Sequence, residues 1–303
     1  MKNILITGSS GMFGGTLARS FKDEFNIYST GNSYFKEQPE NYVKFNLSSN
    51  SYDELINWSK PDIIIHCGAL TNGNYCEENS NEAFNINGIS VQKFLKATNN
   101  DVKIIYISTD AVFPSSIHLA NEKDCVFPEN VYGKSKELGE FFLNSSVNRN
   151  YTIIRTTIVG LNINKEKKGF VKWIINSAIS GEKVGLFTDV MFTPISIWDL
   201  ANEINYLMKT GNINSEILHI GGELCSKYVF GYKLLKTLNI STKNLSKSLI
   251  SSFKDRAKRS NDQSLDSSFY QKRYNRTLPT IDEVILNIKK HYEYNQTRKE
   301  NNR

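Results

Sequence analysis

The sequence predicts an α/β protein in which a doubly wound parallel sheet of the Rossmann type is joined to a smaller, C-terminal α/β part. Three apolar runs rich in Ile and Val, at 2–7, 61–69 and 102–109, are separated by amphipathic segments. Such strands are typical of parallel sheets whose two faces are covered by helices. A glycine-rich turn follows the first run, and the regular alternation weakens after about residue 160.

The alternation can be followed element by element through the N-terminal half. The predicted order is a strand at 2–7, a helix at 11–25, strands at 25–30 and 42–46, a helix at 52–59, a strand at 61–69, a helix at 79–98, a strand at 102–109, a helix from Tyr132 and a strand at 151–160. Residues 1–160 are therefore expected to form one domain.

The remaining elements are less regular. Helices are predicted in "FVKWIINSAISG" and "ISIWDLANEINYLMK", and "EILHIGG" (216–222) reads as a late strand. Ser226 is a plausible N-cap, and Thr280 and Glu283 form a capping box for the last helix. We expect 190–222 to return to the first domain, 161–189 and 223–293 to form the smaller part, and 294–303 to be a disordered tail.

Composition narrows the function classes. Hydrophobic residues are 39% and charged residues 22% of the 303, as in a globular protein, and neither a signal peptide nor a membrane span is recognisable. Four cysteines without a CxxC and four scattered histidines predict a cytoplasmic location and no metal site. The net charge of +6 is concentrated in residues 227–303, which hold 17 Lys+Arg and 7 Asp+Glu, but no nucleic-acid motif accompanies it.

The turn after the first strand, "ILITGSSGMFGG", places Gly8, Gly11 and Gly14 in a GxxGxxG pattern. Glycine allows the tight turn and lets backbone N–H groups approach a diphosphate at the start of the next helix. The motif lies between a strand and a helix, so it predicts dinucleotide binding. The second strand ends in "YSTGNSYFK", without the carboxylate that selects NAD or an arginine for a 2′-phosphate. NADPH is slightly favoured over NADH.

Two Tyr-x-x-x-Lys pairs are present, Tyr132–Lys136 and Tyr232–Lys236. With 15 Tyr and 28 Lys, about 1.4 such pairs are expected by chance, so the spacing alone is uninformative. The first pair follows Ser108–Thr109, which end a buried strand, and it opens the next helix. A phenol whose pKa is lowered by a nearby lysine can protonate a carbonyl oxygen, and a strand-end hydroxyl can orient the substrate. Tyr232 is interpreted as a packing or surface residue.

The glycine motif, "STDAVF", "YGKSK" and "HIGG" together resemble the extended short-chain dehydrogenase/reductases, and within them the dTDP-4-dehydrorhamnose reductase family. "HCGALTNGNYCEENSNEAFNIN", "RTTIVG", "KGFVKWI", "FTPISIWDLA" and "KRSNDQSLDSS" extend the resemblance to about residue 268. It implies NAD(P)H-dependent reduction of the C4 ketone of a nucleotide-linked 4-keto-6-deoxy sugar, in the biosynthesis of deoxysugars or cell-surface polysaccharides. Neither nucleic acid nor membrane is an expected partner, and a homodimer is compatible with the resemblance.

The resemblance also implies roles for individual residues. Tyr132, Lys136 and Thr109 would be catalytic. The cofactor would contact Gly8, Ser10, Gly11, Met12, Phe13, Gly14, Asn46, Leu47, Cys67, Gly68, Ala69, Tyr132 and Lys136. The substrate would contact Thr71, Asn72, Thr109, Asp110, Ile158 and Arg259. Arg256 and Lys258 are further candidates for holding a diphosphate.

Three departures from the family pattern leave the nucleotide and the sugar open. Ala111 replaces a tyrosine, Ile158 replaces an aromatic residue, and Arg259–Ser260 replaces Arg-Pro. A 4,6-dehydratase would carry Glu after Asp110, which Ala111 argues against. Two alternatives stay open: a sugar-nucleotide epimerase or epimerase/reductase, and a non-catalytic NADP-binding regulatory subunit such as the β subunit of methionine adenosyltransferase.

Overall fold

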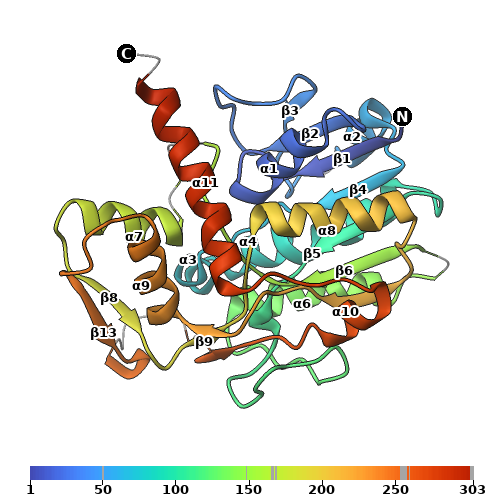
Figure 1. The fold of residues 1–303 in the computed structure, drawn as a ribbon. Coiled ribbons are helices and arrows are strands. Elements are labelled where there is room, and N and C mark those ends of the chain that lie inside the picture. Colours follow the sequence, from blue (N-terminus) through green and yellow to red (C-terminus); the bar gives the residue numbers. More distant parts are fainter. Residues whose placement is uncertain are drawn as a thin grey trace.

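Figure 1 shows the fold of the computed structural model, with the smaller part to one side of a central sheet. The structure describes residues 1–49, 51–147, 149–164, 167, 169–252, 258 and 260–300. Of residues 298–300 it describes only the backbone. Among the described helices, none is both long and apolar enough to cross a membrane.

The central sheet has seven strands, and every neighbouring pair is parallel. The strands are β1 (Asn3–Thr7), β2 (Asn26–Gly31), β3 (Tyr42–Lys44), β4 (Ile63–His66), β5 (Lys103–Ile107), β6 (Tyr151–Arg155) and β11 (Glu216–His219). Their order across the sheet is β11-β6-β5-β4-β1-β2-β3. The order reverses between β1 and β4, as in doubly wound dinucleotide-binding folds. The predicted fold class is confirmed.

Successive residues of each strand point to opposite faces of the sheet, and both faces are buried. On β1, Ile4 and Ile6 enter one core cluster and Leu5 enters another. The first cluster includes residues of α1 (Met12–Phe21) and α8 (Ile197–Thr210). The second includes residues of α2 (Tyr52–Ser59), α5 (Ser90–Ala97) and α6 (Val131–Asn144). Strands buried on both faces explain the continuous apolar runs in the sequence.

The smaller part has its own hydrophobic cluster, built mainly from α7, α9 and α11. Its elements are α7 (Phe170–Ile179), β8 (Val184–Phe187), β9 (Met191–Phe192), β12 (Cys225–Ser226), α9 (Lys227–Thr237), β13 (Leu245–Ser248), a 3₁₀ turn η3 (Ile250–Ser252), β14 (Asp262–Gln263) and α11 (Ile281–Glu300). Short strands β7 (Thr157–Val159) and β10 (Pro194–Ser196) pair with each other, and α10 (Ser268–Tyr274) packs near β11.

The helix predicted at 79–98 is interrupted. A separate helix α3 (Gly73–Glu78) precedes the segment, which itself contains α4 (Ser80–Phe84), a π-helical turn η1 (Asn85–Ile89) and then α5. Within the π-helical turn, Asn87 accepts a hydrogen bond from the Leu70 N–H at 2.7 Å and donates to the Leu70 carbonyl at 2.9 Å. These bonds join the turn to the chain that leaves β4, which a periodicity argument cannot detect.

The tail predicted to be disordered from residue 294 is helical up to Glu300, because α11 continues without a Gly or Pro to stop it. The Thr297 hydroxyl donates to the Glu293 carbonyl at 3.1 Å, which satisfies one carbonyl within this last stretch. Residues 301–303 lie outside the described residues.

A buried chain of hydrogen bonds joins β1, β4 and the π-helical turn through His66. The Gly68 N–H donates to the Thr7 hydroxyl at 3.0 Å, and that hydroxyl is 2.7 Å from the His66 Nδ1. The His66 Nε2 is 2.9 Å from the Ser90 hydroxyl, which donates to the Ile86 carbonyl. Ser90 therefore accepts from Nε2–H, and Nδ1 accepts from Thr7. Burial, assisted by the charge of Lys136, lowers the pKa of His66 to about 3.

A second buried network ties α6 to β5, β6 and β11. Arg155 and Glu140, both almost fully buried, form an ion pair of 2.6 Å, and the Ser108 hydroxyl donates to Glu140. Arg155 also approaches the His219 Nε2 at 3.4 Å, while the His219 Nδ1–H donates to the Ala120 carbonyl at 2.9 Å. Burial and the charge of Arg155 lower the pKa of His219 to about 3.

We predict that Arg155→Met lowers the free energy of unfolding by about 3–5 kcal/mol, because it leaves the Glu140 carboxylate buried without its cation. Arg155→Met combined with Glu140→Leu should recover much of that loss, since an apolar pair needs no partner. Denaturant unfolding followed by circular dichroism at pH 7 measures both. A loss below about 1 kcal/mol for the single variant would contradict the prediction.

The two neutral histidines should make the fold sensitive to mild acid. Between about pH 3 and pH 6.5 the unfolded chain binds protons at His66 and His219 that the folded chain does not. Stability should therefore fall as the pH falls below about 6.5, by up to about 1.4 kcal/mol per pH unit for each histidine. Unfolding curves at pH 7.0, 6.0 and 5.5 measure the slope, which should be smaller in His66→Gln and His219→Gln. If stability falls equally steeply with pH in the unmodified protein and in both variants, the prediction is refuted.

Candidate active site

The turn between β1 and α1 lies at the carboxyl edge of the sheet, where two positions admit only glycine. Gly8 has φ +71°, and a Cβ there would lie 2.7 Å from the Gly68 Cα. A Cβ on Gly14 would lie 2.7 Å from the Gly8 carbonyl oxygen. The N-cap of α1, Gly11, provides no side-chain hydrogen bond to the first N–H groups of the helix. This crowded turn and uncapped helix start fit the diphosphate of a dinucleotide.

The other candidates for cofactor contact lie along the same edge. Asn46 and Leu47 follow β3, and residues 67–69 follow β4. Gly68 packs closely against Leu47, whose Cδ1 would be 2.6 Å from a Cβ on Gly68. Ser10 and Phe13 are buried, and Phe13 belongs to the core that α1 forms with the sheet. Contact between Phe13 and a cofactor would therefore involve its backbone.

Thr109 ends the segment after β5, and its hydroxyl is fully engaged. It donates to an Asp110 carboxylate oxygen at 2.8 Å and accepts from the Ala111 N–H at 3.1 Å. Asp110 is buried and also accepts from the Thr157 hydroxyl. Burial raises the pKa of Asp110, while the hydrogen bonds from Thr157 and Thr109 and the charge of Lys227 lower it.

Tyr132 is the second residue of α6, whose N-cap is Asn130. The Asn130 side chain accepts from the Gly133 N–H at 2.8 Å, which fixes the first turn of the helix. Thr109 lies near enough to the Tyr132 hydroxyl for a Thr109 hydrogen bond to influence the pKa of the phenol. Burial is the largest influence on the phenol and raises its pKa, and the Thr109 hydrogen bond opposes it. Lys136 is not among the influences on this pKa, so the structure does not show the lowering expected from the lysine.

Lys136 lies one helical turn after Tyr132 and is almost completely buried. Its Nζ lies over the Tyr106 ring, 3.8 Å from the centroid. Burial lowers the pKa of Lys136 to about 7, against the opposing charges of Glu140 and Cys67. The ammonium therefore lies between the residues after β4 and the middle of α6, where a bound anion would restore its charge.

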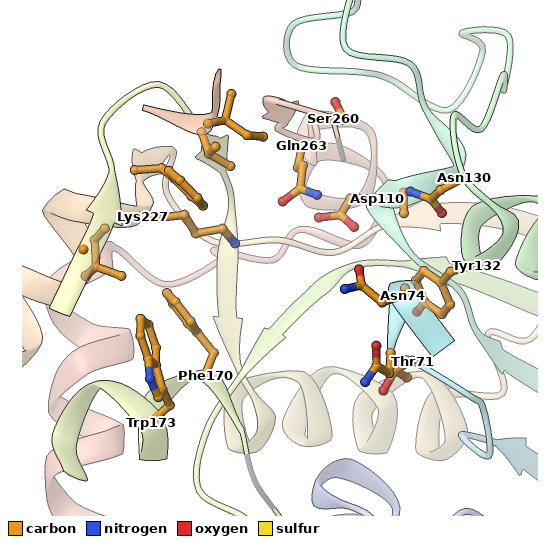
Figure 2. A pocket seen from close by; sticks show the side chains of 18 of the residues that line it. Thr71, Asn74, Asp110, Asn130, Tyr132, Phe170, Trp173, Lys227, Ser260 and Gln263 are labelled. Carbon is orange, nitrogen blue, oxygen red and sulfur yellow. The ribbon is translucent and has the colours of Figure 1, made fainter. Parts of the chain in front are cut away.

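A cavity of about 850 Å³ opens between the carboxyl edge and the smaller part. The sheet side of its lining includes Thr71, Asn72, Asn74, Asp110, Ala111, Asn130 and Tyr132. The smaller part contributes Phe170, Trp173, Lys183, Lys227, Ser260 and Gln263, among others. Figure 2 shows Tyr132, Thr71 and Asn74 at one end of the cavity, and Phe170 with Trp173 at the other.

Not every predicted substrate contact lies in this lining. Thr71, Asn72 and Asp110 do, and Thr109 is hydrogen-bonded to Asp110. Ile158 does not: β7 pairs with β10, and the side chain packs against the core of the sheet and α8. Its expected role in the sugar pocket is therefore unsupported.

The basic C-terminal candidates divide into two groups. Lys258 pairs with Glu129 at 2.7 Å, its side chain is 70% exposed, and it is not part of the described cavity lining. Arg256 and Arg259 lie outside the described residues.

The second Tyr-x-x-x-Lys pair lies on α9, where Tyr232 is partly exposed and stacks on Tyr228.

Several lining residues were not predicted, above all Phe170, Trp173 and Lys227. "FVKWI" contains two of them at the three-residue spacing of one helix face, but a core-facing helix has the same pattern. Lys227 follows the N-cap Ser226, and no local feature separates it from the other lysines. Both segments reach the cavity only through the packing of the smaller part.

Known proteins resemble this chain over most of its length. Residues 1–293 match the family described as the RmlD substrate binding domain. The spore coat polysaccharide biosynthesis protein SpsK of Bacillus subtilis is 26% identical over 250 residues, 81% of this chain and 83% of that protein. A dTDP-4-dehydrorhamnose reductase of Sinorhizobium fredii is 31% identical over 183 residues, 56% of this chain and 60% of that protein.

The crystal structure of dTDP-4-dehydrorhamnose reductase from Bacillus anthracis, in complex with NADP, superposes with a TM-score of 0.82 at 26% identity. The superposition covers 95% of this chain and 99% of the other. These findings confirm the resemblance that the motifs indicated. Because the family match extends over residues 1–293, the chain belongs to the family of the RmlD substrate binding domain.

Proposed function

We propose that the protein is an NAD(P)H-dependent oxidoreductase that reduces the C4 ketone of a nucleotide-linked 4-keto-6-deoxy sugar. One observation carries the proposal: the Tyr132 side chain lines a cavity of about 850 Å³ at the carboxyl edge of the sheet, together with Asp110, which accepts from the Thr109 hydroxyl. A cavity of this volume is in the range of small-molecule sites. The family relatives named as polysaccharide biosynthesis protein and dTDP-4-dehydrorhamnose reductase support the substrate class.

The cofactor would be held by the glycine turn, by the start of α1 and by the residues that follow β3 and β4. When bound, the reduced nicotinamide supplies the hydride that adds to the ketone carbon. The absence of a carboxylate at the end of β2 favours NADPH slightly over NADH.

Tyr132 completes the reduction by giving its phenol proton to the ketone oxygen. Burial raises the pKa of Tyr132, so the acid form is present at neutral pH. The alkoxide that develops on the sugar is more basic than a phenolate, and proton transfer to it is therefore favourable. The phenol would donate to the substrate oxygen, and Thr109, held by Asp110, would position that oxygen.

Lys136, one helical turn after Tyr132 on α6, provides a positive charge near the reacting groups. A negative cofactor raises its pKa from the low value of the free protein and so restores the ammonium. This charge then stabilises the phenolate that remains after proton transfer. The burial that makes the free lysine weakly basic also keeps water away from the phenolate.

The proposal is tested by oxidation of NADPH and NADH with a panel of dTDP-, UDP- and GDP-linked 4-keto-6-deoxy sugars. We expect turnover with at least one of them and a product reduced at C4. Tight binding of NADPH without turnover of any sugar would contradict the reductase assignment and favour the non-catalytic alternative. A C3- or C5-inverted product would instead indicate an epimerase/reductase.

We predict that Tyr132→Phe lowers kcat by about 10²- to 10⁴-fold, because the proton donor is removed while the ring that lines the cavity is kept. KM should change little. Steady-state kinetics with the best sugar of the panel measures both constants. Tyr232→Phe is the matched control, since it alters the other Tyr-x-x-x-Lys pair, and it should behave as the unmodified protein. Full activity in Tyr132→Phe would refute the assigned acid.

We also predict that NADPH binding at pH 8 takes up as much as about one proton. Lys136 has a pKa of about 7 in the free protein and is mostly neutral at pH 8, whereas the bound cofactor favours its charged form. Titration calorimetry in two buffers of different ionisation enthalpy measures the uptake. It should vanish in Lys136→Met and persist in Lys134→Met, which changes an exposed lysine of the same helix. Uptake that is unchanged in Lys136→Met would exclude this lysine as its source.

A further inference from the structure

Lys227 is held in the cavity wall by the backbone on both sides of it. It is the first residue of α9, and its N–H donates to the Val190 carbonyl at 3.0 Å. The preceding strand β12 pairs with β9, and the Ser226 side chain caps α9 by accepting from the Val229 N–H at 3.2 Å. The Cα position and the initial direction of this side chain are therefore fixed by the fold.

Two aromatic rings fix the rest of the side chain. The Lys227 Nζ lies 3.4 Å from the centroid of the Phe192 ring and 5.4 Å from that of Phe170. Both distances are within the range of a cation–π interaction. Figure 2 shows the Lys227 amine directed toward the middle of the cavity, with Phe170 and Trp173 below it in this view and Asp110 across the cavity.

The charges of the cavity favour an anionic ligand. Asp110 is the one carboxylate in the described lining, and it already accepts from the Thr109 and Thr157 hydroxyls. Lys227 acts on it through charge, as one of the influences that lower the pKa of Asp110. With Lys183, the lining holds two ammonium groups and one carboxylate. The described lining therefore has an excess of one positive charge, and an anion with two negative charges would turn it into an excess of one negative charge.

We infer that Lys227 binds the diphosphate of a nucleotide-linked substrate, and this inference rests on the proposed function. The sugar lies at the Tyr132 end, because the acid is there. Lys227 lies between that end and the aromatic pair Phe170–Trp173, whose ring centroids are 6.3 Å apart and 29° from parallel. A nucleotide sugar has the same order, sugar then diphosphate then base, and the aromatic pair offers the base a stacking surface.

The inference is tested with Lys227→Met, which keeps a long side chain against Phe192 and Phe170 and removes the charge. Titration calorimetry would measure the binding of dTDP, UDP and GDP, and of thymidine, uridine and guanosine. We expect the preferred diphosphate to bind about 10- to 100-fold more weakly to the variant, as for loss of a charge-assisted hydrogen bond. Nucleoside affinity should be unchanged, and Lys227→Arg should recover diphosphate binding.

Lys233→Met is the matched control, because it removes one positive charge from the same helix at the exposed pair with Asp282. It should leave diphosphate binding within about 2-fold of the unmodified protein. The inference is overturned if Lys227→Met changes diphosphate affinity by less than 2-fold, if it weakens nucleosides equally, if it weakens NADPH instead, or if no nucleoside diphosphate binds the unmodified protein.

These readouts separate the inference from the proposed function. Diphosphate binding that depends on Lys227, without turnover of any 4-keto sugar, would uphold the anion site and refute the reductase assignment. Turnover of a 4-keto sugar with an unchanged KM in Lys227→Met would uphold the reductase and refute the anion site.

Discussion

The buried ion pair between Arg155 and Glu140 is the interaction on which the geometry of the site depends. Glu140 lies on α6, the helix that carries Tyr132 in its first turn, and it also accepts from Ser108, the neighbour of Thr109. One carboxylate thus holds the helix that carries the phenol against the strand end that carries its hydroxyl partner. Through His219, the same network reaches β11 at the edge of the sheet. A polar network that is fully satisfied rigidifies its surroundings, which suits two groups that must meet at hydrogen-bond distance.

The two halves of the cavity are built by different means. The sheet side consists of residues that follow parallel strands, so their proximity results from the topology. The opposite side includes aromatic and basic residues on α7 and α9, whose positions depend on the separate hydrophobic cluster of the smaller part. The reacting groups can therefore stay constant while the recognition of the substrate changes, because substitutions on α7 or α9 leave the sheet network intact.

The sequence predicts much of the sheet side and little of the opposite side. Apolar runs such as 102–109 identify buried strands, and a strand-end hydroxyl distinguishes Tyr132 from Tyr232 because both signals are local. Lys227 has no local signal, since its role depends on Phe192 and Phe170, which lie far away along the chain. Ile158, which motif comparison placed in the pocket, is partly buried against the core that includes α8 and is not part of the described cavity lining, because its position depends on the pairing of β7 with β10. The π-helical turn was missed because it depends on the long-range bonds of Asn87.

The return of the chain to the sheet through α8 and β11 has a consequence for how this protein can be divided. β11 supplies the seventh strand, and α8 covers the same face as α1, yet both follow α7 and β8 of the smaller part. A fragment ending at residue 160 would lack both elements and would expose the apolar face that α8 covers. The two parts are therefore interleaved along the chain. Exchange of substrate preference with a relative would require grafting individual segments rather than fusing one half to another.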